Sequence, residues 1–267
     1  MHLSDFHLHS TFSPDSKTPV EEVCEAALRQ GMVEICITDH WECGDNMMGT
    51  HMKEHPFDVE GYLGEIDRLR ALYEGRLTIR TGLEIGNCLC DLPLGTMALE
   101  LPLDFVIGSL HIVYGADAHR TDYSVCDPNE ALRQYVIDCG TLARQAPHFD
   151  ALGHFTLIRR YAARDGFETD LSGMWPDIED ALRVLIEQGI ALEVNTSGLR
   201  FFDQTIPGAD VFARYRALGG ELVTIGSDGH RPEQYATGIH EAQRMLREVG
   251  FTHHMTYQQR KPVPHRL

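Results

Sequence analysis

The sequence predicts an α/β fold in which parallel strands and helices alternate and close into a single barrel. Strand-like and helix-like runs alternate from end to end, which is typical of βα units. A chain of 267 residues has the length of one α/β barrel. With 43% hydrophobic and 24% charged residues the composition is globular, and no apolar run is long enough to cross a bilayer. No linker, repeat or low-complexity segment interrupts the pattern, so we expect one domain spanning residues 1–267.

The alternation predicts seven strands. The first begins the stretch 3–15, where apolar and polar residues alternate. The other six are residues 34–40, 77–84, 104–111, 151–154, 190–195 and 221–228. Helices are expected at residues 18–30, 59–73, 128–145, 176–188, 208–218 and 232–249. Polar loops are expected at 41–56 and 114–128, Pro/Gly-rich material without a predicted helix or strand after residue 84, and a basic tail at the C-terminus.

Polar side chains close every predicted strand. His7 and His9 are two residues apart, which places both imidazoles on one side of the first strand, and two such groups can share a metal ion. Asp15 follows a Ser-Pro turn and brings a carboxylate near the same strand end. The later strands close with Asp39 and His40, Glu84, His111, His154, Asn195, and Asp228 with His230. Because the carboxyl ends of barrel strands converge on one mouth, the sequence predicts a shared metal centre there.

The number of candidate ligands indicates how many ions are bound. The candidates are His7, His9, Asp15, His40, Glu84, His111, His154, Asp228 and His230. At three or four protein ligands per catalytic ion, this set is too large for one ion and fits three, with Glu84 bridging a pair. Nitrogen and oxygen ligands without thiolate suit zinc, manganese or iron without choosing among them. Paired ions suit displacement at phosphorus, and Asp39 is expected to support the ligands rather than act as a base.

The motifs that carry these residues resemble those of the PHP (polymerase and histidinol phosphatase) superfamily over essentially the whole chain. They are Phe6-His-Leu-His9 with Asp15, Thr38-Asp-His40, Gly82-Leu-Glu84, Gly108-Ser-Leu-His111, Gly153-His154 and Gly226-Ser-Asp-Gly-His230. The resemblance implies a distorted seven-stranded, TIM-like (β/α) barrel with three divalent ions at the C-terminal mouth. By that likeness the ligand groups are His7, His9, Glu84 and Asp228; Glu84, His111 and His154; and Asp15, His40 and His230. Some family members carry a histidine where Asp15 stands, which leaves the metal preference of the third group open.

Within the superfamily, three segments resemble the monofunctional histidinol-phosphate phosphatases of histidine biosynthesis. They are residues 153–161, 195–200 and 260–262. The resemblance implies hydrolysis of L-histidinol phosphate to L-histidinol and phosphate by attack of a metal-bridging hydroxide. The acid that protonates the leaving group is not identified, and neither is the oligomeric state.

Arginines beyond strands five and six are expected to hold the phosphate. Of the 23 basic residues only three are lysine, a ratio that favours bidentate anion recognition by guanidinium groups. The candidate substrate-binding residues are Arg159, Arg160, Tyr161, Ser197 and Arg200.

Other functions are weighed against this one. A PHP phosphoesterase acting on nucleotides or other small monoesters has the same metal centre. The loops after strands two and four would then determine the substrate specificity through their contacts with the leaving group. An amidohydrolase-type C–N hydrolase also begins with His-x-His but often bridges its metals with a carboxylated lysine, and no lysine here ends a strand. A proofreading module attached to a polymerase fits poorly, because the net charge of −17 repels nucleic acid and anionic membranes.

The expected compartment is the cytoplasm. Seven cysteines at irregular spacing are typical of a reduced protein, and the first strand begins too close to Met1 for a signal peptide.

Overall fold

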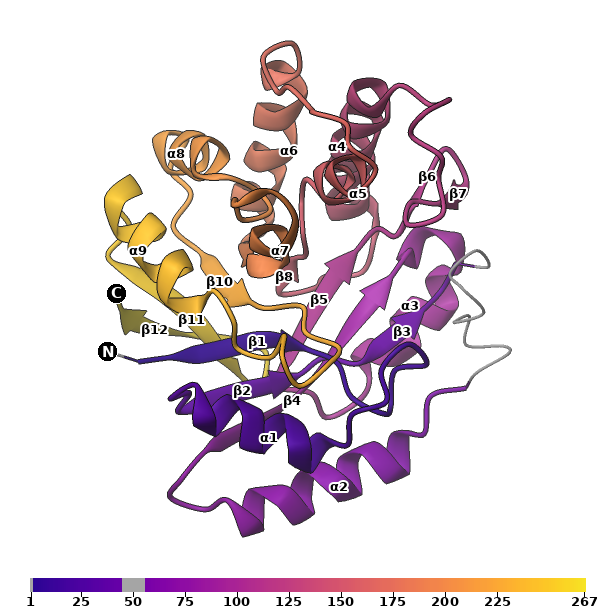
Figure 1. The fold of residues 1–267 in the computed structure, drawn as a ribbon. Helices are drawn as coiled ribbons and strands as arrows, with labels where there is room; N and C mark the ends of the chain where they lie inside the picture. The colour runs from indigo at the N-terminus through magenta and orange to yellow at the C-terminus, as the bar shows by residue number, and fades with distance from the viewer. Residues whose placement is uncertain (1, 45–55) are drawn as a thin grey trace.

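The computed structural model describes residues 2–44 and 56–267 and forms a nearly closed barrel of parallel strands (Figure 1). The strand order is β1-β2-β4-β5-β8-β9-β10, and every neighbouring pair on this path is parallel. These strands are Ser4–Leu8, Glu34–Ile37, Thr78–Gly86, Phe105–Ser109, Ala151–Leu152, Ala191–Asn195 and Val223–Gly226. The first and last meet beyond β10, where the His9 amide donates to the carbonyl of Gly229 at 2.9 Å. The seven-stranded barrel expected from the sequence is confirmed.

Helices cover the outside of the barrel (Figure 1). The longer ones are α1 (Val20–Arg29), α2 (Val59–Leu72), α4 (Pro128–Gln145), α6 (Trp175–Gln188), α8 (Ala209–Ala217) and α9 (Ile239–Val249). Short ones are α3 (Leu92–Leu99), α5 (Ile158–Arg164), α7 (Leu199–Phe202), and the 3-10 turns η1 (Cys88–Cys90) and η2 (Thr196–Gly198). Asp58 and Asp127 cap α2 and α4 by accepting backbone N–H bonds, which defines where these helices begin. Among the residues that the structure describes, no helix has the length and apolar character needed to cross a membrane.

Four expectations for local structure were wrong. Residues Leu92–Leu99 form α3 where no helix was predicted, because Asp91 caps a first turn that carries proline. The expected basic tail is an antiparallel hairpin of β11 (His253–Gln258) and β12 (Lys261–Arg266). The last helix begins at Ile239 rather than residue 232, because Gly238 just before it has a φ of 76°. Part of the predicted loop 41–56 belongs to β3 (His40–Glu42), and residues 45–55 of it lie outside the described residues.

A second small hairpin, β6 (Ile112–Val113) with β7 (Ala116–Asp117), lies in the predicted loop 114–128 and just before it.

The interior of the barrel is divided into an apolar layer and a polar layer. Side chains of five parallel strands and of β11 form a separate buried cluster, Phe6, Cys36, Phe105, Ile107, Ala151, Ala191 and Tyr257. The rings of Phe6 and Phe105 lie 5.4 Å apart, and that of Tyr257 lies 4.9 Å from Phe105. A register shift between Asp5 and Leu8 lets the adjacent residues Phe6 and His7 reach different layers of the same interior. The apolar layer supports the polar residues that lie nearer the carboxyl ends of the strands.

Candidate metal centre

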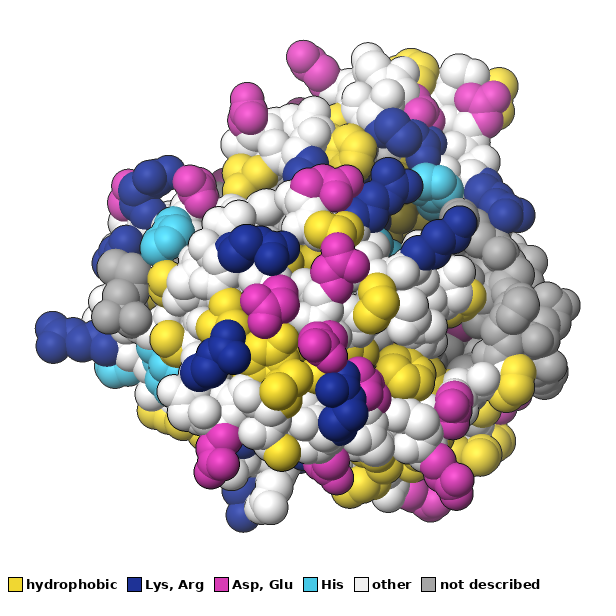
Figure 2. Space-filling model, turned by 60° about the horizontal axis from the view of Figure 1, so that its bottom comes forward, with side chains coloured by type: hydrophobic (Ala, Val, Ile, Leu, Met, Phe, Trp, Pro, Cys, Tyr) yellow, Lys and Arg dark blue, Asp and Glu magenta, His cyan; other side chains and the backbone are white. Residues whose placement is uncertain are grey.

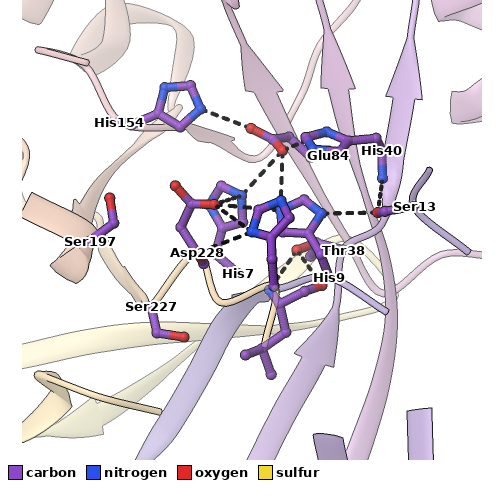
Figure 3. Close-up of polar contacts among 12 residues, drawn as sticks. His7, His9, Ser13, Thr38, His40, Glu84, His154, Ser197, Ser227 and Asp228 are labelled. Atoms are coloured by element: carbon purple, nitrogen blue, oxygen red, sulfur yellow. Dashed lines mark hydrogen bonds and ion pairs between the residues drawn. The ribbon is translucent and has the colours of Figure 1, made fainter. Parts of the chain in front are cut away.

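Glu84 of β4 lies at the centre of the polar layer, and five histidines surround its carboxylate. Figure 3 shows His7, His9, His40 and His154 around it. Its Oε1 lies 3.1 Å from His111 Nε2 and 2.9 Å from His154 Nε2. Its Oε2 lies 3.3 Å from His7 Nε2, 3.4 Å from His9 Nε2 and 3.0 Å from His40 Nδ1. Glu84 and His7 come from β4 and β1, His40 begins β3, and the other histidines follow their strands, so the fold assembles this group from across the barrel.

Two further carboxylates extend the group towards solvent. Asp15 Oδ2 lies 3.4 Å from His40 Nε2 and 3.2 Å from His230 Nε2. Asp228 Oδ1 lies 3.7 Å from His9 Nε2 and 3.6 Å from His230 Nδ1. The side chains of Asp15 and His230 are 24% and 23% exposed, whereas those around Glu84 are nearly inaccessible. All nine predicted ligands therefore lie together, and the site opens on the Asp15 and His230 side.

The centre has the properties of a divalent-metal site. His7 Nε2, His9 Nε2 and His40 Nδ1 are buried and have no hydrogen-bond partner among the described residues. An unpaired buried nitrogen is costly, and a metal ion would satisfy it. Three groups of ligand atoms are close enough to share one ion: His7, His9 and Glu84; His40, Glu84 and His111; and His9, His40 and His230. The overlap of these groups fits a cluster of several ions.

Carboxylates behind two of the histidines hold them in the tautomer that a metal requires. Glu193 Oε1 lies 2.6 Å from His7 Nδ1, and Glu42 Oε2 lies 2.8 Å from His111 Nδ1. Each carboxylate holds a proton on Nδ1, so that Nε2, which faces Glu84, is the nitrogen that can bind an ion. Glu193 also accepts the backbone N–H of His154 at 2.7 Å, which links two predicted ligands through one side chain.

Hydroxyl groups position the other two inner histidines. The Ser13 hydroxyl lies 3.1 Å from His9 Nδ1 and donates to Asp39 Oδ1 at 2.6 Å. It also accepts the backbone N–H of His40 at 3.0 Å, so Asp39 reaches the site through Ser13 rather than through a ring. Tyr135 OH lies 3.1 Å from His154 Nδ1. Its proton goes to the Leu110 carbonyl at 2.9 Å, and it therefore accepts from the imidazole.

The pKa shifts show that the Glu84 carboxylate requires positive charge beside it. Burial alone would raise the pKa of Glu84, but His7, His111 and His40 hold it well below its ordinary value. Burial lowers the pKa of His111, yet Glu84 and Glu42 together raise it to about 9. The pKa of His9 lies well below its ordinary value because of burial and of the neighbouring His230 and His40. The centre thus holds an ionised carboxylate beside positive partners, and the positive charge is what metal ions would supply.

Two predicted ligands stand on strained backbone, and glycines make room for others. His154 and Asp228 have φ values of 29° and 52°, a region that costs energy for residues with a side chain. A Cβ at Gly226 would lie 2.3 Å from His7 Cβ, and one at Gly86 would lie 2.2 Å from Glu42 Oε2. Strained backbone and glycines therefore occur at the positions where the residues of the centre pack closely.

A cleft of about 400 Å³ leads from the centre to the surface. Asp15, Asp228 and His230 form part of its wall, and the rest includes His119, Tyr161 and the four arginines Arg160, Arg164, Arg200 and Arg231. Over most of the face drawn in Figure 2 acidic and basic side chains are mixed, and basic side chains gather beside a histidine towards the upper right. The net charge of −17 is thus locally reversed in the cleft, which favours an anionic ligand.

The predicted substrate-binding residues divide into two groups. Arg160 donates to Asp228 Oδ2 at 2.6 Å, to Ser197 Oγ at 2.8 Å and to Tyr161 OH at 2.8 Å. Arg200 lines the same cleft and donates to the carbonyls of Ser227 and Asp228 at 3.0 and 3.1 Å.

Arg159 takes no part in this network. It donates to Thr169 Oγ1 at 3.3 Å, and its guanidinium lies 5.3 Å from the ring centre of Phe202. The structure does not bring it to the cleft, so its role in binding substrate stays a prediction without geometric support.

The sequence did not predict several residues that hold the predicted ligands in place. Glu193, Glu42, Ser13 and Tyr135 contact predicted ligands but stand in no motif that marks them. Only Glu193 carried a usable signal, because it lies two residues before Asn195 and therefore on the same, inward face of its strand.

The comparisons with known proteins agree with this site. A model of the PHP domain matches residues 5–197. The chain belongs to the PHP family. It is 30% identical over 279 residues to the probable histidinol-phosphatase of Deinococcus radiodurans, which covers 98% of this chain and 99% of that protein. It is 28% identical over 257 residues to the histidinol-phosphatase of Lactococcus lactis subsp. lactis, which covers 92% of this chain and 91% of that protein.

A solved structure has a similar fold. The crystal structure of histidinol phosphate phosphatase from Lactococcus lactis, complexed with zinc, L-histidinol and phosphate, superposes with a TM-score of 0.81 and 25% sequence identity. The match covers 97% of this chain and 98% of that one.

Proposed function

We propose that this PHP protein is a metal-dependent histidinol-phosphatase, which hydrolyses L-histidinol phosphate to L-histidinol and phosphate. The observation that carries the proposal is the Glu84-centred cluster with unpaired imidazole nitrogens, open to an arginine-lined cleft. The relatives named histidinol-phosphatase, and the solved relative with zinc, L-histidinol and phosphate, support the same substrate.

We assign the nine residues His7, His9, Asp15, His40, Glu84, His111, His154, Asp228 and His230 to the metal ions. When bound, divalent ions lower the pKa of water and polarise phosphate oxygens, which is the chemistry that a phosphomonoester requires. Glu193 and Glu42 keep a proton on Nδ1 of His7 and His111, so that the opposite nitrogen stays a ligand. The near-complete burial of the inner ligands excludes bulk water and strengthens every charge interaction inside.

Arg160 and Arg200 are the groups that we assign to the phosphate. Both guanidinium groups border the cleft beside Asp228 and His230, and a planar fork of N–H donors matches phosphate oxygens. Tyr161 and Ser197 hold Arg160 in place, since each forms a 2.8 Å hydrogen bond with it. Substrate would therefore enter with its phosphate towards Asp228 and its organic part towards His119 and Phe201.

The direct test is phosphate release from a panel of monoesters by protein loaded with zinc, manganese or iron. L-histidinol phosphate should exceed nucleoside monophosphates and simple sugar phosphates in kcat/KM by orders of magnitude, and metal-stripped protein should be inactive. A flat panel, or preference for a nucleotide, would keep the metal centre and overturn the substrate. Absence of release with every metal would overturn the phosphatase itself.

A further inference from the structure

Two buried thiols contact each other where β3 and β4 end. Cys43 directly follows β3, and Cys88 is the first residue of η1 after β4. The Cys43 amide donates to the Gly86 carbonyl at 2.9 Å, which keeps the two strand ends together at this point. The Cys43 thiol donates a hydrogen bond to the sulfur of Cys88. The two sulfur atoms therefore need only a small movement to become covalently bonded.

Helix α3 leaves room for this pair of thiols. A Cβ at Gly95, in the middle of α3, would lie 2.2 Å from Cys88 Sγ and 3.8 Å from Cys43 Sγ. A side chain at this position would displace the Cys88 sulfur, so the glycine allows the two thiols to stay in contact. Gly95 and Ala98 are the buried residues of α3, which packs against η1 and β4 (Figure 1). A short helix with so little buried surface can open locally and admit a small oxidant.

Each cysteine directly follows a residue that holds His111. Glu42 Oε2 lies 2.8 Å from His111 Nδ1, and Asn87 Oδ1 accepts the backbone N–H of His111 at 2.9 Å. Asn87 also donates to Glu42 Oε1 at 2.7 Å, so the three residues form one buried network. Asn87 has a φ of 52°, a strained conformation that depends on the contacts around it. A movement of Cys43 towards Cys88 would therefore act on the residues that position a predicted metal ligand.

The hydrogen bond also makes one of the two thiols easier to oxidise. It lowers the pKa of the Cys88 thiol, and together with burial it raises the pKa of the Cys43 thiol. The first proton therefore leaves from Cys88, and the thiolate is the form of cysteine that reacts with oxidants.

The chemistry of the pair with hydrogen peroxide balances in two steps. The Cys88 thiolate attacks one oxygen of the peroxide, the O–O bond breaks, and the hydroxide that leaves takes up a proton to become water. The sulfur of Cys43 then attacks the resulting sulfenic acid, the S–O bond breaks, and a second water leaves with the thiol proton. One peroxide is reduced, two thiols are oxidised, and an S–S bond is formed.

We propose that Cys43 and Cys88 form a reversible disulfide on oxidation by a peroxide, and that this disulfide weakens the hold of Glu42 and Asn87 on His111. A disulfide places its sulfur atoms about 2.05 Å apart, much closer than any hydrogen-bonded thiols. The backbone beside Glu42 and Asn87 must follow that movement. The role of His111 as a metal ligand rests on the proposed function, and the residues that orient such a ligand affect metal affinity by about 10- to 100-fold.

Peptide mapping without reduction tests whether the disulfide forms. Zinc-loaded wild-type protein is treated with hydrogen peroxide, and its remaining thiols are alkylated. Mass spectrometry should then find Cys43 bonded to Cys88, and a phosphine reductant should remove the bond. Cys126→Ala is the matched control, since this half-buried cysteine contacts the Asp127 carbonyl at 3.9 Å and its loss should leave the disulfide unchanged. Reduced Cys43 after the treatment, or a bond from Cys88 to Cys90 instead, would overturn the proposal.

Zinc retention tests the effect of the disulfide on the metal centre. Oxidised wild-type protein should lose zinc at a chelator concentration about tenfold lower than the reduced protein, and the phosphine should reverse the difference. Peroxide should not change zinc retention in Cys43→Ala, which cannot form the bond. The measurement uses no substrate, so it stays valid if histidinol phosphate proves not to be hydrolysed. Equal zinc retention in oxidised and reduced wild type, or an equal loss of zinc in Cys43→Ala, would overturn the proposal.

Discussion

At the scale of single residues, the centre depends on one buried carboxylate shared by five histidines. Glu84 is 1% exposed and lies 2.9 to 3.4 Å from all five imidazoles. An ionised carboxylate in such a place is stable only beside positive charge, because isolated burial costs several kcal/mol. From this position we expect Glu84 to be the residue on which the proposed metal centre depends most.

Replacing Glu84 by glutamine should reduce metal content and activity together. The amide keeps the shape but removes the negative charge that holds two groups of ligands. We expect loss of at least one ion per chain and a fall in kcat of more than about 100-fold, because changing a residue that only supports a ligand already costs about 10- to 100-fold. Metal analysis and phosphate release measure both. Glu60→Gln, on the exposed face of α2, is the control, and full retention of metal and activity in Glu84→Gln would refute the bridging role.

Replacing Glu193 by glutamine should weaken the site without removing a ligand. Its carboxylate orients His7 and holds the His154 amide, so the amide side chain should lower metal affinity or activity by about 10- to 100-fold. Titration of metal-stripped protein with zinc measures the affinity. Excess zinc should restore most of kcat, because Glu193 positions the ligands and does not bind the ions itself. A loss of kcat that excess zinc does not restore would contradict this positioning role.

Replacing Arg160 by alanine should raise KM and leave metal content intact. The loss of one charge-assisted contact with phosphate, about 1.5–3 kcal/mol, corresponds to roughly 10- to 100-fold in KM. Arg160→Lys keeps the charge and should recover part of the loss. Arg159→Ala is the matched control, since Arg159 contacts Thr169 and Phe202, and its KM should change less than about threefold. Equal effects of the two alanines would remove Arg160 from the phosphate site.

Residue identities in the centre could be predicted from sequence because strand-end position and side-chain chemistry agree. His7, Glu84 and Asp228 each close or nearly close a strand, and parallel strands bring such ends together. Ser13 and Tyr135 could not be predicted, because a hydroxyl in a loop or helix has no spacing that marks the histidine it contacts. Their partners are fixed only by the folded chain.

At the scale of elements, the C-terminal hairpin closes the amino end of the barrel. Tyr257 of β11 packs into the inner apolar cluster beside Phe105. Arg260 in the turn of the hairpin pairs with the buried Asp150 just before β8, and its amide donates to the Asp104 carbonyl at 2.9 Å. The hairpin is thus part of the barrel rather than an appendage.

The C-terminal hairpin could not be predicted from its sequence. The turn residues Gln259 and Arg260 have φ values of 50° and 64°, a conformation for which asparagine and glycine are the usual signals. Neither stands there, and the two prolines of β12 argue against a strand except at an edge. Helix α3 was not predicted, because proline and glycine are typical of turns, yet its proline occupies the first turn of the helix.

Removing Arg260 should destabilise the protein in a pH-dependent way. Burial raises the pKa of Asp150 above its ordinary 3.8, and Arg260 offsets part of that rise. Without Arg260 the carboxylate takes up its proton at still higher pH. The cost of Arg260→Gln, about 1–3 kcal/mol after allowing for solvent at the ion pair, should be present at pH 7 and shrink as the pH falls through the folded-state pKa values of Asp150 without and with Arg260, both of which lie above its ordinary 3.8.

Denaturant unfolding of the wild type and Arg260→Gln at pH 7 and pH 4 measures this difference. Arg266→Gln, on the same hairpin, should change stability by less than about 0.5 kcal/mol at either pH. An equal cost of Arg260→Gln at both pH values would show that the pair with Asp150 is not responsible.

At the scale of the whole molecule, metal binding and folding should be coupled. The predicted ligands lie on, or in the segments that follow, β1, β3, β4, β5, β8 and β10, so ions that join them would cross-link most of the barrel. Strain at His154 and Asp228 adds a cost that bound metal would offset. A ligand at about 1,000 times its Kd stabilises the folded state by about 4.1 kcal/mol.

Removing metal should therefore lower the unfolding temperature and abolish activity at once. For a chain of this size a loss of about 4 kcal/mol corresponds to a fall in Tm of about 10 °C. Treatment with a chelator, followed by calorimetry and phosphate-release assays, gives both quantities, and zinc added in excess of the chelator should restore them. An unchanged Tm in protein shown to be metal-free would contradict the coupling.

The most direct test of the metal centre is anomalous diffraction from crystals of the metal-loaded protein, recorded on both sides of the metal's absorption edge. Three peaks in the barrel mouth should stand about 2.0–2.2 Å from nitrogen or oxygen atoms of the nine assigned residues, with Glu84 contacting two of them. Peaks that avoid Glu84, or no peak in the mouth of active protein, would contradict the account.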